Sequence, residues 1–151
     1  MALLGMSVWR SLLGVDRATV IEEIDFDEES ETVVAHVRPR RSTKRRCGRC
    51  AVRAPLYDQG RGRRRWRALD LGTLRCHLEA DSPRVRCPIH GITVAQVPWA
   101  RHDAGHTKDF DDQVAWLVTH TSKSAVQALL RVAWRTVGSI VERVVADGVA
   151  Q

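Results

Sequence analysis

Two short pairs of metal-ligand residues constrain this chain more than any other feature. Two residues separate Cys47 from Cys50, and two separate Cys87 from His90. A two-residue gap lets one tight turn present both ligands of a pair to the same ion. Zinc takes four thiolate or imidazole ligands in a tetrahedron, and a site closed by four protein ligands is structural rather than catalytic. The pattern therefore predicts one structural zinc site formed by Cys47, Cys50, Cys87 and His90.

The residues around the two pairs suit such turns. Gly48 can adopt a positive φ between the first two cysteines, and Gly91 can release the second turn. Two disulfides, or four idle thiols, are the alternative interpretation. Cys76 alternates with Leu74 and Leu78 on one face of a strand-like run, so we predict a core thiol there. Cysteines grouped as ligands, without a secretory signal, indicate a reducing, cytoplasmic compartment.

The positive charge of the chain is concentrated in one segment. The net charge is +6, but residues 38–67 hold 13 Lys or Arg against the single acid Asp58, so this segment carries +12 and the remainder −6. Lys and Arg side chains that bind DNA phosphates release condensed counterions, which drives binding. The segment therefore indicates a nucleic-acid partner rather than a membrane surface or a merely solvated loop. No apolar run reaches the roughly 20 residues that cross a bilayer. We expect phosphate contacts from Arg45, Arg46, Arg61, Arg63, Arg64 and Arg65.

Hydrophobic periodicity predicts an α+β protein. Period-2 runs indicate two hairpins, one of strands 19–26 and 32–37 and one of strands 66–71 and 74–80, with a loop over 55–62. Two further strands, 84–87 and 92–97, place the second ligand pair on the turn between them. These strands define a small zinc-binding β domain over residues 1–98. Residues 99–107, which include His102 and His106, are expected to be a polar connector rather than a second metal site. From residue 108 to residue 151 the period becomes helical.

The helical segment predicts a three-helix helix-turn-helix domain. The expected helices are 109–120, a second one capped by Thr121 or Ser122 and ending near Leu130, and a third after a break at 131–133. The third helix would be the recognition helix in the major groove. Its outward side chains are expected to contact DNA: Arg135, Thr136, Ser139 and Arg143. A bundle face that packs against another domain would show the same pattern.

The order of these motifs resembles the N-terminal region of the ISL-three family of bacterial insertion-sequence transposases. The resemblance rests on Cys47-x-x-Cys50, Tyr57-Asp58-Gln59-Gly60, Arg64-Arg65-Trp66-Arg67, Cys87-Pro88-x-His90-Gly91 and Thr121-Ser122-Lys123-Ser124 through Trp134-Arg135-Thr136-Val137, and it covers roughly residues 15–147. Arg131 and Ala133 depart from it, because such turns usually carry Gly and such helix starts Ser.

The resemblance implies a protein that binds the terminal inverted repeats of a mobile element as double-stranded DNA. In the family a metal-dependent DDE nuclease domain follows, and nothing in these 151 residues groups three carboxylates as that chemistry requires. We therefore expect a non-catalytic, DNA-binding region with bound zinc, with homo-oligomerisation left open. The alternatives are a free-standing zinc-containing transcriptional regulator and a zinc-ribbon-like protein-interaction module.

Overall fold

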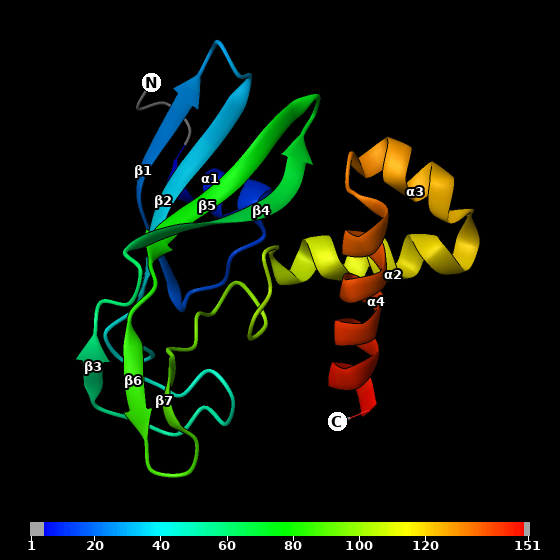
Figure 1. Ribbon diagram of the computed structural model, residues 1–151. Coiled ribbons are helices and arrows are strands. Elements are labelled where there is room, and N and C mark those ends of the chain that lie inside the picture. Colours follow the sequence, from blue (N-terminus) through cyan, green and yellow to red (C-terminus); the bar gives the residue numbers. More distant parts are fainter. Residues whose placement is uncertain (1–4, 150–151) are drawn as a thin grey trace. The chain divides into compact units, whose positions relative to one another are not determined.

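The computed structural model of the chain describes residues 5–149 and divides into two compact units, Met1–Thr107 and Lys108–Gln151 (Figure 1). We refer to them as the β unit and the helical unit. The expected domain bounds 1–98 and 108–151 include residues 1–4 and 150–151, which lie outside the described residues. The mixture of sheets and helices agrees with the predicted α+β class.

A four-stranded sheet forms the larger part of the β unit. Its strands are β1 (Thr19–Asp27), β2 (Thr32–Pro39), β4 (Arg63–Leu71) and β5 (Leu74–Asp81), in the order β1-β2-β5-β4. The strands β1 and β2, and the strands β4 and β5, are the two antiparallel hairpins predicted from alternation. The central strands β2 and β5 run parallel, with Val33 opposite Cys76.

A smaller sheet carries the second ligand pair. It contains β3 (Leu56–Asp58), β6 (Arg84–Cys87) and β7 (Gly91–Val94), in the order β3-β6-β7 with antiparallel neighbours. The β3 strand falls in the expected loop, because three residues are too few to show an alternating pattern. The turn between β6 and β7 holds the pair, as predicted.

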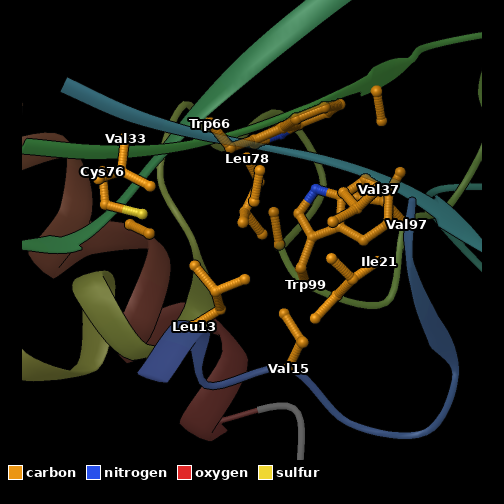
Figure 2. Packing of buried hydrophobic residues seen from close by; sticks show 14 of the residues in the cluster. Leu13, Val15, Ile21, Val33, Val37, Trp66, Cys76, Leu78, Val97 and Trp99 are labelled. Carbon is orange, nitrogen blue, oxygen red and sulfur yellow. The ribbon is translucent and has the colours of Figure 1, made fainter. Parts of the chain in front are cut away.

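The core of the β unit lies on one face of the four-stranded sheet (Figure 2). Trp66, Leu78 and Cys76 are almost fully buried, and the rings of Trp66 and Trp99 pack edge to face at a centroid distance of 5.4 Å. Cys76 is thus the predicted core thiol. An unpredicted helix, α1 (Met6–Leu13), adds Leu13 to this cluster, and Leu13 is the one residue that it buries.

The expected connector 99–107 is also part of the β unit. Trp99, Ala100 and Ala104 are buried in the core, and Thr107 donates its amide hydrogen to the carbonyl of Arg67. The sequence did not predict this burial, because the segment contains many polar residues and its apolar residues follow no helical or strand period.

The helical unit contains α2 (Lys108–His120), α3 (Lys123–Leu130) and α4 (Trp134–Val149). Ser122 caps α3, since its hydroxyl accepts the amide hydrogen of Ala125 at 3.1 Å. Arg131 ends α3 in the left-handed region, with φ 54°.

With α1, the described residues hold four helices, one more than predicted. None of the four is long and apolar enough to cross a membrane. The core of the unit contains Phe110, Val114, Val126, Val137 and Ile140.

Candidate metal centre and nucleic-acid interface

The four predicted ligand residues meet at one point. One ligand atom from each of Cys47, Cys50, Cys87 and His90 lies within 4.8 Å of the others. The sulfurs of Cys50 and Cys87 are 3.6 Å apart, and His90 Nδ1 is 3.7 Å from the sulfurs of both Cys47 and Cys87. Bonds of about 2.0 to 2.3 Å at tetrahedral angles place ligand atoms roughly 3.5 to 3.8 Å apart. The donor set and its spacing therefore fit a four-coordinate metal.

All four cysteines are free thiols, so the disulfide alternative finds no support. Two backbone amides also point at the cluster. The amide of Arg49 donates to the sulfur of Cys47 at 3.3 Å, and that of Ile89 donates to the sulfur of Cys87 at 3.4 Å. Such hydrogen bonds favour the thiolates that a metal requires.

Gly48 is needed for space rather than for a positive φ. The left-handed position of the first turn is Ala51, with φ 61°. A Cβ added at Gly48 would lie 2.5 Å from the carbonyl oxygen of Val94 and 2.6 Å from Nδ1 of His102. Gly48 also donates its amide hydrogen to that Val94 carbonyl. This close approach joins the first ligand turn to β7, which explains the glycine.

The thiols of the chain differ in acidity. Burial disfavours the Cys87 thiolate, but hydrogen bonds from the backbone at His90 and Ile89, with those from the His90 and Cys50 side chains, outweigh it and lower the pKa of Cys87 to about 6. At Cys50 a hydrogen bond from Val52 favours the thiolate, yet burial and the neighbouring sulfurs raise the pKa. Burial raises the pKa of Cys76 to about 12, so this thiol is neutral at physiological pH.

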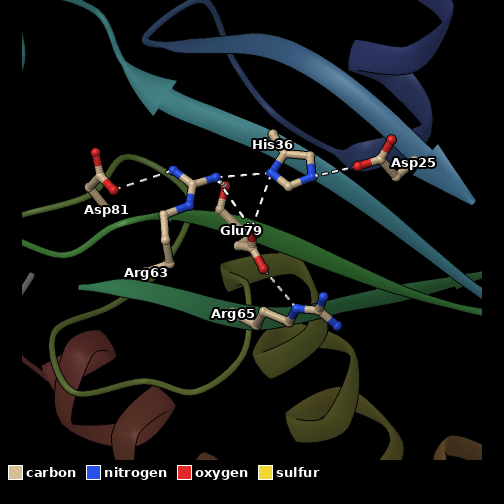
Figure 3. A network of polar contacts seen from close by, with 6 residues as sticks. All are labelled: Asp25, His36, Arg63, Arg65, Glu79 and Asp81. Carbon is tan, nitrogen blue, oxygen red and sulfur yellow. Dashed lines mark hydrogen bonds and ion pairs between the residues drawn. The ribbon is translucent and has the colours of Figure 1, made fainter. Parts of the chain in front are cut away.

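Two of the predicted DNA-contacting arginines belong to a polar network on the outer face of the sheet (Figure 3). Arg65 Nε lies 2.9 Å from Glu79 Oε1, and Arg63 lies 3.4 Å from both Glu79 and Asp81. The Arg65 hydrogen bond, with the positive charges around it, holds the pKa of Glu79 below its ordinary value. His36 joins Glu79 to Asp25. These carboxylates offset much of the local positive charge.

The other four arginines that were predicted to contact phosphates fall into two groups, two with hydrogen-bond partners inside the β unit and two that are exposed. Arg64 points to the other face, where it packs over Trp66 at 4.8 Å and donates to the carbonyl of Ala104; burial lowers its pKa. Arg46 donates to the carbonyl of Ala51 at 3.1 Å. Arg45 and Arg61 are exposed. The sequence alone could have predicted that Arg64 lies on the core face of the sheet, because alternation along a strand places it on the opposite face from Arg63 and Arg65.

The start of α4 presents the predicted recognition residues. Arg135 and Ser139 are exposed, Thr136 is partly buried, and the Ser139 hydroxyl donates to the carbonyl of Arg135. Arg143 lies differently, because it pairs with the fully buried Asp111 of α2 at 3.4 Å. Lys123 of α3 lies over the half-exposed Trp134 ring at 4.9 Å.

Comparisons with known proteins support the resemblance given by the motifs. Residues 43–90 match the zinc-finger of transposase IS204/IS1001/IS1096/IS1165, and residues 95–145 match the helix-turn-helix domain of transposase family ISL3. Two curated relatives, from the CDC 1551 / Oshkosh and H37Rv strains of Mycobacterium tuberculosis, are each a transposase for insertion sequence element IS1557. Each is 58% identical to this chain over 144 residues. The match covers 93% of the chain but 32% of each relative's length. No solved structure matches.

Proposed function

Since the chain belongs to the ISL3 family of transposases, of which it carries the zinc-finger and helix-turn-helix domains, we propose that it binds double-stranded DNA at the ends of an insertion element. The β unit supplies contacts to the backbone, and α4 contacts base edges in the major groove. In this proposal, strand cleavage and joining belong to a DDE domain outside these 151 residues. The protein would act in the cytoplasm.

One observation carries this proposal. The turn 131–133 joins α3 to α4 so that Arg135, in the first turn of α4, is exposed on the helix end that enters the groove in helix-turn-helix proteins. An arginine there can form two hydrogen bonds with a guanine, which discriminates against other bases by about 1 to 3 kcal/mol. Ser139 and Thr136 follow on the same helix. Arg143 is left out, because its guanidinium pairs within the helical unit.

The metal in the proposal is zinc. Three thiolates and one imidazole, closed by the protein with no open position, are a typical structural zinc set. Purified protein should hold about one zinc per chain, as measured by mass spectrometry of the metal. Cys50→Ser should lose the metal, whereas Cys76→Ala should keep it. Full zinc retention in Cys50→Ser would remove the assignment of the ligands.

The DNA-binding proposal is tested by selection in vitro. The zinc-loaded chain would select duplexes from a random pool, and the selected sequence would be compared with the repeats that flank the gene. Arg135→Ala should lose roughly 5- to 150-fold in affinity for the selected duplex, as expected for one bidentate contact, and little for a scrambled one. Arg75→Ala, an exposed arginine of β5, is the charge-matched control and should leave the preference intact.

The outcomes separate the candidate functions. Selected sequences that match the flanking repeats support binding of element ends. A strong selected sequence unrelated to those repeats would instead favour a transcriptional regulator. The absence of any DNA binding at low salt would refute the proposal and favour the protein-interaction module.

A further inference from the structure

Four basic side chains line a hollow beside the first ligand turn. The hollow has a volume of about 390 Å³, and its lining consists of Arg41, Lys44, Arg45 and Arg53 with two neutral residues. No acidic side chain belongs to this lining. A larger hollow of about 520 Å³ shares Arg41, Lys44 and Arg45 and extends towards the four-stranded sheet, where its lining also includes the acids Glu22 and Asp81. Three of the four cations therefore line both hollows.

These four side chains differ from the arginines of the sheet. Within residues 5–149, all four are exposed and none forms an ion pair or a side-chain hydrogen bond, whereas Arg63 and Arg65 are held by carboxylates. Four like charges around one hollow repel each other and produce a positive potential. An anion that enters the hollow relieves this repulsion, so the arrangement favours a phosphate.

The backbone at Arg45 supports the same interpretation. Its φ of 58° is left-handed, which strains a residue that has a Cβ but not glycine. The Arg45 carbonyl accepts the amide hydrogen of Ala54 at 2.9 Å, and the Arg46 carbonyl accepts that of Gln96 at 2.8 Å. The chain thus holds an arginine where glycine would be free of strain, which is typical of a side chain with a function.

We propose that Arg41, Lys44, Arg45 and Arg53 are the phosphate-binding site through which the β unit holds the backbone of double-stranded DNA. The inference rests on the proposed DNA-binding function and assigns the contacts to a specific hollow. It moves the phosphate contacts from Arg63, Arg64 and Arg65, which pair or pack within the β unit, to cations that lack such partners. The site contains no group that reads bases, so it contributes affinity for any sequence.

Two charge-matched double variants of the full, zinc-loaded chain test the site. Lys44→Gln with Arg53→Gln removes two charges from the hollow, and Arg63→Gln with Arg65→Gln removes two from the network. The readout is the affinity for a selected and a scrambled duplex between 50 and 200 mM salt. Each phosphate contact contributes about 3.5-fold to the loss of affinity over this fourfold change in salt. As salt rises over this range, the affinity of the hollow variant for both duplexes should therefore fall by a factor about ten times smaller than that of the wild type. The affinity of the network variant should fall as much as that of the wild type.

Arg45→Gly provides an independent arm. It should weaken binding to both duplexes while the protein keeps its zinc and unfolds at the same or a higher temperature, because the strain is removed together with the charge. This separates loss of a contact from loss of fold.

Three results would overturn the inference. An unchanged salt dependence in the hollow variant is the first, and an equal change in both double variants is the second, since that would reflect net charge alone. Tighter binding of RNA than of duplex DNA, lost in the hollow variant, would show that the partner is wrong. The failure of the proposed function looks different, because the wild type would then bind no DNA at low salt.

Discussion

Replacing Arg143 by glutamine should destabilise the helical unit rather than remove a DNA contact. Arg143 Nη1 of α4 lies 3.4 Å from Asp111 Oδ2 of α2, and Asp111 has no exposed surface. The variant keeps a side chain of similar length but removes the positive charge. The Asp111 carboxylate would then remain buried without this cation, which low-dielectric surroundings make costly.

The structure sets the size of the effect. Removing one partner of a buried ion pair costs about 3 to 5 kcal/mol. Here the Arg143 side chain is 23% exposed, so water screens part of the attraction, and we expect about 2 to 3 kcal/mol. An exposed pair would contribute less than about 1 kcal/mol, so the two cases are clearly separable.

Hydrogen exchange of the full chain measures this locally. In Arg143→Gln, the most protected amides of α2 and α4 should exchange roughly 30- to 150-fold faster, which corresponds to 2 to 3 kcal/mol. Arg135→Gln, on the exposed side of the same helix, is the matched control and should change exchange by less than about twofold. Adding Asp111→Asn to Arg143→Gln should recover much of the loss, because the buried charge is then gone.

Wild-type exchange rates in Arg143→Gln would refute this reasoning. In that case the 3.4 Å pair would contribute nothing to stability, and Arg143 would again be available to DNA.

Four further outcomes are expected. Arg131→Gly should raise the free energy of unfolding of the helical unit by about 0.5 to 1 kcal/mol in urea titrations, because it relieves the left-handed φ of 54°; Ser122→Ala should lower it by about 0.5 to 2 kcal/mol through loss of the α3 cap. Gly48→Ala should lower zinc affinity in chelator competition, because the new Cβ would contact the Val94 carbonyl. Zinc affinity should rise with pH as thiols release protons, and its slope should steepen below about pH 6, where the Cys87 thiol is protonated as well; a slope that stays constant through pH 6 would contradict this acidity.

The local sequence by itself determined the ligand set, two of the hairpins and the start of α3. The ligand spacing identified Cys47, Cys50, Cys87 and His90, because a metal requires particular atoms at a short separation along each turn. Alternation identified the hairpins β1–β2 and β4–β5. Hydroxyls before an apolar run predicted Thr121 or Ser122 as the cap of α3, and the structure has Ser122 there. These features depend on contacts between residues close in sequence, which is why periodicity and spacing reveal them.

Tertiary structure alone decided which side chains are free. Arg63, Arg65 and Arg143 look like any other arginine in the sequence, and only the positions of Glu79, Asp81 and Asp111 on neighbouring elements show that they are paired. The parallel pairing of β2 with β5, and the burial of Trp99 against Trp66, also join distant segments. A charge or an apolar ring has no intrinsic partner in the chain, so its role is fixed only when folding places another group beside it.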